Sequence, residues 1–270
     1  MSKRAIPSKI DWMTKNVLES KLEQSAIDVA KEAGAYLRQR SESARSVRME
    51  DAKDIKLKAD VDSETLIRNV LTKETGLPII GEEMGGESGL LRGKQKYWVV
   101  DPLDGTYNYF RGQTETCVSI GLMEGLQFLF GVVYNFNTDG MVYGGKGKGI
   151  FFNDESVQVH WVDKLEKACL MTGFPMHANY TPPQLMDYMG KVMQFKKVRM
   201  IGSAAWALAN VALGRADAYY EQSTRLWDIA AGAALVEAAG GYVEIKFIEE
   251  EELILDAWAG GREEWASVFI

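Results

Sequence analysis

Cysteine and histidine are scarce in this chain, with 2 Cys and 2 His among 270 residues. Two cysteines exclude a disulfide-rich scaffold and leave too few thiolates for a structural zinc site. Two histidines likewise argue against a histidine-rich metal centre. Basic residues are outnumbered, 31 Lys+Arg against 38 Asp+Glu, giving a net charge of −7. A general nucleic-acid binder needs a basic surface, so no nucleic-acid partner is expected, and any chemistry falls to carboxylates.

Long hydrophobic runs are also lacking. The most apolar stretch, Leu126 to Phe136, contains Gln127 and Asn135 and is far shorter than the roughly 20 residues of a membrane span. The basic start of the chain is not followed by the apolar segment of a signal peptide. We therefore expect a cytoplasmic protein that does not enter a membrane.

Hydrophobic periodicity predicts a mixed, layered fold, α+β or α/β. Helical spacing predicts helices over residues 15–40, 62–75, 183–195, 203–213 and 228–239. Short apolar runs separated by two-residue turns predict a buried strand over 97–100 and an antiparallel meander over 118–143. A charged hairpin-like stretch over 45–60 precedes the second helix. We expect two parts, residues 1–152 and 153–270, within one compact unit.

Three acidic clusters follow or open apolar elements: Glu82-Glu83, Asp101-Pro102-Leu103-Asp104 and Asp228. Ligand sites of layered α/β folds form at such strand and helix ends. Carboxylates gathered in a dry crevice repel one another, and a bound divalent cation relieves that repulsion. A ligand set of oxygens alone selects Mg²⁺ first, with Mn²⁺ or Ca²⁺ next.

The second cluster predicts a tight turn that returns Asp101 and Asp104 to the same side and frees the Leu103 carbonyl as another oxygen ligand. Gly105-Thr106 then begins a helical turn, and Ser203 is placed as the N-cap of a later helix. Positive helix ends beside acids indicate a phosphate pocket. Each feature taken alone also has an ordinary structural explanation. Paired glutamates occur in solvated loops, and an aspartate turn is common on protein surfaces. Ser203 and Asp228 are both typical helix N-caps.

Three stretches together resemble the inositol monophosphatase family: Gly81-Glu82-Glu83, then WVVDPLDGTYNYFRG over 98–112, then the segment over 199–241 that contains Trp227-Asp228. Their joint occurrence in this order is highly specific. The resemblance implies an αβαβα sandwich and a Mg²⁺-dependent, lithium-inhibited phosphatase of small phosphate monoesters. It also implies a homodimer, and Mn²⁺ as an alternative ion.

The resemblance also assigns ligands for two or three metal ions. Glu82, Asp101 and the carbonyl of Leu103 match the ligands of the first ion. Asp101, Asp104 and Asp228 match those of the second. Glu82 also matches a ligand of a weaker third ion.

Further positions match residues that handle the substrate and the attacking water. Gly105 and Thr106 match the residues that hold the phosphate, and Asp60 matches the acid that assists Thr106. Glu83, beside Glu82, completes the candidate catalytic set of Thr106, Asp60 and Glu83. The positions matching contacts to the alcohol are Ser203, Ala204 and Glu221.

The segment Asp54 to Asp60 departs from the family pattern. A threonine of that pattern is replaced by Leu57, with Lys56 and Lys58 on either side. This change leaves the third metal open. The substrate stays open as well: inositol monophosphate comes first, and fructose 1,6-bisphosphate, a nucleotide 3′-phosphate or histidinol phosphate are alternatives. A non-catalytic regulatory relative is less compatible with four retained acids.

Overall fold

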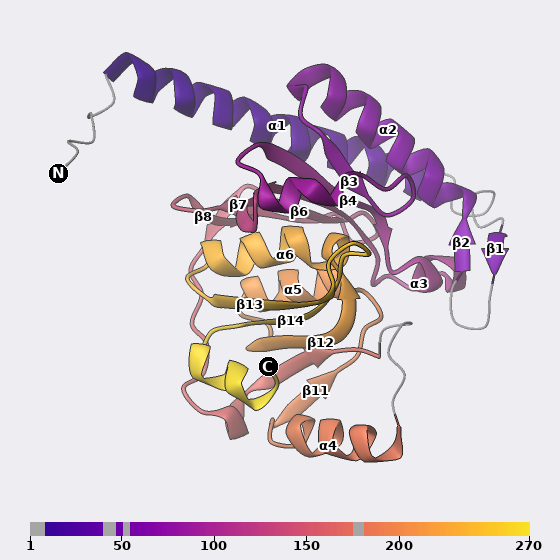
Figure 1. The fold of residues 1–270 in the computed structure, drawn as a ribbon, viewed down its shortest axis with the longest axis vertical. Helices are drawn as coiled ribbons and strands as arrows, with labels where there is room; N and C mark the ends of the chain where they lie inside the picture. The colour runs from indigo at the N-terminus through magenta and orange to yellow at the C-terminus, as the bar shows by residue number, and fades with distance from the viewer. Residues whose placement is uncertain (1–8, 40–46, 51–54, 175–180) are drawn as a thin grey trace.

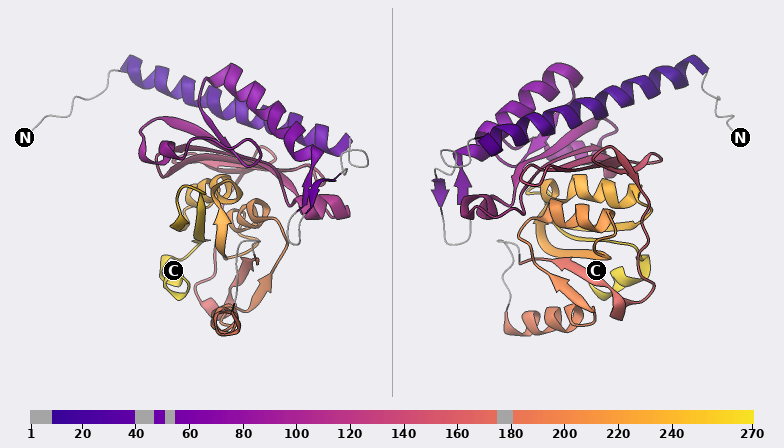
Figure 2. Two further views of the ribbon diagram at one scale, coloured as in Figure 1. Left: turned by 45° about the vertical axis from the view of Figure 1, so that its right-hand side comes forward. Right: turned by 180° about the vertical axis from the view of Figure 1, so that it is seen from behind.

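The protein is described by a computed structural model over residues 9–39, 47–50, 55–174 and 181–270. Its layers follow the order αβαβα, which confirms the expected sandwich (Figure 1). Helices α1 and α2 cover one face of a seven-stranded sheet, and helices α5 and α6 lie between that sheet and a five-stranded one (Figure 2). The helices are α1 Lys9–Gln39, α2 Lys58–Thr75, α3 Thr106–Arg111, α4 Pro182–Val192, α5 Ala204–Ala212 and α6 Leu226–Ala238, with 3-10 turns η1 Ser88–Arg92, η2 Leu165–Lys167 and η3 Glu263–Val268.

The seven-stranded sheet has the order β3-β4-β5-β6-β7-β8-β9. Only the β3–β4 pairing in it is parallel, and the remaining pairs form an antiparallel meander. This confirms the meander predicted over 118–143. The strands are β3 Ile79–Gly81, β4 Lys96–Asp104, β5 Cys117–Glu124, β6 Gln127–Asn135, β7 Gly140–Gly145, β8 Gly149–Phe152 and β9 Glu155–Val157.

The five-stranded sheet has the order β11-β10-β12-β14-β13, with β10 parallel to both of its neighbours. A separate pair, β1 with β2, supports part of the hairpin-like stretch predicted over 45–60, whose residues 45–46 and 51–54 lie outside the described residues. The strands are β1 Val47–Glu50, β2 Ile55–Leu57, β10 Cys169–Thr172, β11 Lys197–Arg199, β12 Ala218–Arg225, β13 Tyr242–Glu249 and β14 Ile254–Gly260.

Three apolar cores fill the spaces between the layers, one under α1 and α2, one around α5 and α6, and one outside the five-stranded sheet beneath α4 and η3. Helix α6 packs closely on the seven-stranded sheet because two glycines face it. A Cβ on Gly131 would collide with the carbonyl oxygen of Ala231, and one on Gly121 would lie 3.0 Å from the nitrogen of Ala231. This close approach holds the middle of α6 against β5 and β6, next to the strand β4 that carries Asp101 and Asp104. None of the described helices has the length and apolar character that crossing a membrane requires.

Candidate active site

Strand β4 brings Asp101 and Asp104 to the same face through a β-bulge. Asp101 pairs with Ser119, whereas Asp104 pairs with Cys117, so the β4 strand carries one extra residue. Residues three apart on a regular strand point to opposite faces, and the extra residue restores a common face. The tight turn predicted at Asp101–Asp104 is therefore wrong, because the segment stays extended. The Asp101 carboxylate also accepts the backbone N–H of Leu103 at 3.0 Å.

Asp104 lies at the N-terminal end of helix α5, deep in the interior. Its carboxylate accepts backbone N–H groups from Ala204 at 3.1 Å and Ala205 at 2.9 Å, and it also accepts the Ser203 hydroxyl. Ser203 occupies the N-cap position, but its own side chain makes no capping bond to the helix backbone. The predicted capping by Ser203 is thus corrected: Asp104 supplies the acceptor from a neighbouring strand. The positive end of α5 faces a carboxylate of the chain itself.

Thr106 connects the aspartate segment to helix α2. Its hydroxyl lies 3.1 Å from the Asp60 carboxylate and 3.0 Å from the carbonyl oxygen of Leu103. Gly105, just before it, has φ 84°, a left-handed conformation that favours glycine, and begins α3. Burial, with a further contribution from the charge of Glu83, raises the pKa of Asp60 to about 7. The predicted pairing of Asp60 with Thr106 is present.

Asp60 also determines where helix α2 begins. Its carboxylate accepts the backbone N–H of Leu57 at 2.6 Å, so the helix starts at Lys58. The sequence prediction placed this start later, at Asp62, because it did not assign a capping role to Asp60. Leu57, the residue that departs from the family pattern, is fully buried in the core under α1 and α2.

Asp228 stands in the first turn of helix α6, where its carboxylate accepts the Arg225 N–H at 3.0 Å and the Thr224 hydroxyl at 2.9 Å. The helix therefore starts at Leu226, before the predicted start at Asp228. Burial and the charge of Asp104 raise the pKa of Asp228 to about 7. Asp228 therefore caps the start of α6, and its charge also interacts with that of Asp104 on β4.

Glu221 belongs to the neighbouring strand β12. Its carboxylate accepts the Tyr219 hydroxyl at 2.9 Å. Burial, opposed in part by that hydrogen bond and reinforced by the charges of Asp228 and Asp104, raises its pKa to about 8. Tyr219 is a contact that the sequence reasoning missed, although the alternation of a strand places residues 219 and 221 on the same face.

The acids of the three sequence clusters interact electrostatically. Burial raises the pKa of Asp101 well above its ordinary value, and the charges of Glu82, Asp104 and Asp228 raise it further. Glu82 follows β3, and its N–H donates to the carbonyl of Val100 at 3.2 Å, next to Asp101. The three sequence clusters, which are far apart along the chain, thus lie near enough in space for their charges to interact.

The donor chemistry of these residues fits a hard divalent cation, since the site offers carboxylates that destabilise one another. As the side chains stand, the described residues contain no group of three or more acidic, cysteine or histidine side chains that could hold an ion. Binding would therefore require side-chain movement. Both carboxylate oxygens of Asp104 accept N–H groups at the start of α5, and these bonds restrict the movement of its side chain.

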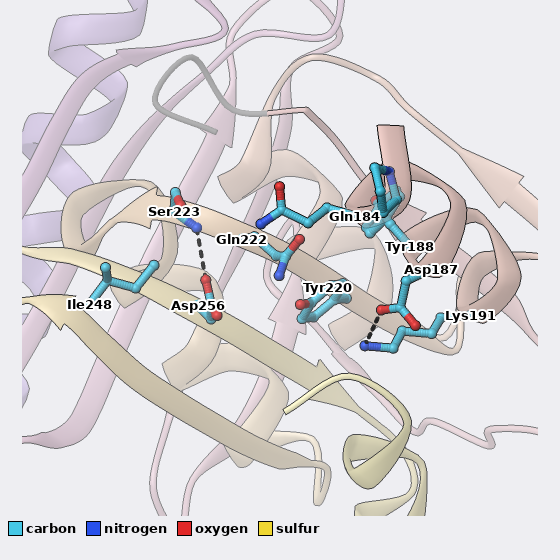
Figure 3. A pocket seen from close by; sticks show the side chains of 10 residues that line it. Gln184, Asp187, Tyr188, Lys191, Tyr220, Gln222, Ser223, Ile248 and Asp256 are labelled. Carbon is cyan, nitrogen blue, oxygen red and sulfur yellow. Dashed lines mark hydrogen bonds and ion pairs between the residues drawn. The ribbon is translucent and has the colours of Figure 1, made fainter. Parts of the chain in front are cut away.

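A polar hollow of about 440 Å³ lies on the other face of β12, between that strand, α4 and the β13–β14 pair (Figure 3). It is lined by Tyr220 and Gln222, which alternate with Tyr219 and Glu221 along the strand. Asp256 in its wall accepts the backbone N–H of Ser223 at 2.9 Å. This hollow is separate from the acidic cluster and offers residues for matched control variants.

Comparisons with known proteins find a matching family model and related chains. The model of the "Inositol monophosphatase family" matches residues 18–253. The chain is 38% identical to a Nus factor SuhB of Xylella fastidiosa over 68% of this chain and 67% of that protein, and 33% identical to an inositol monophosphatase of Dictyostelium discoideum over 82% and 83%. The crystal structure of extragenic suppressor protein suhB from Bartonella henselae superposes with a TM-score of 0.78 at 30% identity, covering 91% of this chain and 95% of that one.

Proposed function

Because the chain belongs to the inositol monophosphatase family, we propose that it is a Mg²⁺-dependent phosphatase that hydrolyses a polyol phosphate monoester, with inositol monophosphate first. The observation that carries this proposal is the mutual electrostatic interaction of Asp101 with Glu82, Asp104 and Asp228. Buried ionised acids repel one another, and either a bound proton or a bound cation relieves that repulsion, so the cluster favours binding of a cation at neutral pH. With the cation bound, the site would attract a negatively charged phosphate ester, which the carboxylates alone would repel.

Glu82, Asp101, Asp104, Asp228 and the carbonyl of Leu103 would hold the ions. When bound, magnesium would neutralise phosphate charge and lower the pKa of a water for in-line attack on phosphorus. Asp104 and Asp228 are held in place by the backbone at the starts of α5 and α6. These hydrogen bonds limit how far the two carboxylates would move when an ion binds.

Thr106 and Asp60 would orient the attacking water. The Thr106 hydroxyl has a single hydrogen, which it donates to the Asp60 carboxylate or to the Leu103 carbonyl, and its oxygen can also accept a hydrogen bond from a water. With a pKa near 7, the Asp60 carboxyl can take up a proton through that hydroxyl at neutral pH. Glu83 contributes to this pKa by its charge.

Glu221 would bind the alcohol part of the substrate. Its carboxyl is anchored by Tyr219 and lies on the same side of β12 as the acids. A carboxyl group accepts hydrogen bonds from vicinal hydroxyls, which suits a polyol better than a simple alcohol. Ser203 and Ala204 border the same region but bind Asp104, so their part in contacting the alcohol remains a proposal.

One alternative has an observation in its favour, the similarity to a protein named Nus factor SuhB. On that alternative the chain is a regulatory relative without catalytic activity. A phosphate-release assay distinguishes the two functions, since a regulatory protein without catalytic activity would release no phosphate from any ester. Homodimer formation is a further proposal, tested by sedimentation at micromolar concentration.

The deciding experiment is a phosphate-release panel over inositol monophosphates, fructose 1,6-bisphosphate, nucleotide 3′-phosphates and histidinol phosphate, with and without Mg²⁺ and Li⁺. We expect Mg²⁺-dependent release that is greatest for inositol monophosphate and is inhibited by Li⁺. Asp228→Asn should abolish release, whereas Asp256→Asn, the same chemical change in the hollow behind β12, should retain it. Absence of release from every ester would refute the enzyme assignment, and release by Asp228→Asn at the native rate would refute the ligand assignment.

A further inference from the structure

Helix α2 presents a short polar stripe on its otherwise apolar buried face. Asp60, Ser63 and Glu64 stand at helical spacing ahead of the buried Ile67 and Leu71. Each of the three contacts a different segment of the candidate site. Asp60 contacts Thr106, and the Ser63 hydroxyl donates to the carbonyl of Pro102 at 3.1 Å.

The third member, Glu64, contacts the turn that carries Glu82 and Glu83. Its Oε2 accepts the backbone N–H of Glu83 at 2.7 Å, and its Oε1 accepts that of Met84 at 3.1 Å. The side chain of Glu64 is 0% exposed. A buried carboxylate that binds two consecutive amides fixes both the place and the orientation of that peptide.

Arg68 completes the contact one helical turn later. Its Nε donates to Glu64 Oε1 at 2.6 Å, and its guanidinium also donates to the carbonyl of Gly85 at the far end of the turn. Gly81 leaves room for the Glu64 carboxyl, because a Cβ there would collide with it. The pair therefore binds this turn at Glu83, Met84 and Gly85, and Arg68 balances the buried charge of Glu64.

We propose that Glu64 is a positioning residue that sets where Glu82 and Glu83 lie, and thereby sets the affinity of the site for its divalent cation. This inference rests on the proposed metal-dependent function. The turn is rich in glycine, with Gly81, Gly85 and Gly86 around the two acids, so its backbone needs external contacts to keep one conformation. Glu64 supplies two such contacts from a rigid helix.

The test compares Glu64→Ala and Glu64→Gln with the native chain and with Asp62→Asn. Asp62 is on the same helix but accepts the Tyr36 hydroxyl at 2.6 Å, away from the turn, so its variant reports on a change from carboxylate to amide on α2 alone. Binding of Mn²⁺ is measured by electron paramagnetic resonance, and exchange of the Glu83 and Met84 amides is measured by hydrogen exchange. Loss of a supporting contact weakens metal binding by about 10- to 100-fold.

We expect weakening of that size and faster exchange of both amides in Glu64→Ala, a smaller effect in Glu64→Gln, and native binding in Asp62→Asn. Glutamine has one acceptor oxygen and preserves the volume, so it decides the question if the alanine variant does not fold. Native Mn²⁺ affinity or native amide exchange in a folded Glu64 variant would overturn the proposal. If the native chain neither binds Mn²⁺ nor releases phosphate, the proposed function fails, and the amide exchange alone still decides whether Glu64 positions the turn.

Discussion

The carboxylate of Asp104 accepts the backbone N–H of Ala205 at 2.9 Å, so a strand residue caps helix α5. Capping of this kind satisfies donors that the helix itself leaves open. The same carboxylate is proposed to bind a cation. The capping of α5 by Asp104 can therefore be distinguished from its proposed binding of a cation only by comparing variants that keep an acceptor oxygen at this position with variants that remove it.

Asp104→Ala removes the acceptor and should lower the free energy of unfolding by about 1–2 kcal/mol, the usual size of a lost helix cap. Asp104→Asn keeps one acceptor oxygen and should be the more stable of the two, measured by urea denaturation. In both variants the rate of phosphate release should fall by more than about 10- to 100-fold, which is the usual loss when a residue that only supports a metal ligand is replaced. Asp256→Asn, the same kind of change in the hollow behind β12, serves as the control and should keep its activity. Equal stability of the two Asp104 variants would argue against the cap.

Stability without a divalent ion should fall as the pH rises from about 4 to about 8. Burial raises the pKa of Asp60 and of Asp228 to about 7, and that of Glu221 to about 8. The folded chain then binds more protons than the unfolded chain between the ordinary and the raised pKa, so unfolding becomes easier through that window. Each group contributes at most about 1.4 kcal/mol per pH unit.

The measurement for this pH dependence is urea denaturation in EDTA at pH 5, 6, 7 and 8. Asp60→Asn should flatten the slope between pH 5 and 7, while the exposed-site variant Asp163→Asn should leave it unchanged. Adding Mg²⁺ should restore stability at pH 8. A metal-free chain that became more stable between pH 5 and 7 would contradict the raised pKa values.

Glu221 should determine preference for a polyol. Glu221→Ala removes a hydrogen-bonding carboxyl and should raise the KM for inositol monophosphate by about two- to tenfold, since a net hydrogen bond contributes about 0.5–1.5 kcal/mol. The KM for p-nitrophenyl phosphate, which has no vicinal hydroxyls, should change little. Gln222→Ala alters the adjacent residue on the opposite face of β12 and should change neither value. Equal rises for both esters would remove Glu221 from substrate recognition.

Gly105→Ala should impair both folding and catalysis. The φ of 84° is unfavourable for alanine by about 1–2 kcal/mol, and its Cβ would lie 2.7 Å from the carbonyl oxygen of Glu115. The displaced backbone would move the neighbouring Thr106 hydroxyl. Gly76→Ala is the control, because Gly76 has φ 66° at the end of α2 with no atom near its Cβ position. It should lose stability alone, as measured by thermal unfolding beside phosphate release.

Much of the site was predictable from the sequence because its acids follow or open apolar elements. The pairing of Asp60 with Thr106 and the electrostatic grouping of Asp101 with Glu82, Asp104 and Asp228 agree with the predictions. What the sequence could not supply was the partner of each polar group. Ser203 has the composition of an N-cap, yet the acceptor for that helix comes from Asp104, which is distant along the chain.

Element boundaries failed for a related reason. Helices α2 and α6 both begin before their predicted starts, because an acid inside the first turn caps the helix from within. Glu64 also escaped notice, although its spacing from Asp60 places both on one helical face. Only the tertiary structure shows that this face meets the turn after β3 rather than solvent.

The bulge in β4 makes the length of this strand as important as its composition. Tyr97 and Val99 face the core around α5 and α6, whereas Leu103 faces the core under α1 and α2, although its number has the same parity. One inserted residue thus changes which face each later side chain occupies. Substitutions at 102 or 103 leave that count intact, whereas deletion of either residue would remove the bulge and leave one residue, instead of two, between Asp101 and Asp104. The backbone that lies between the two carboxylates, and the carbonyl oxygens that it presents beside them, therefore depend on the number of residues in this segment as well as on their kind.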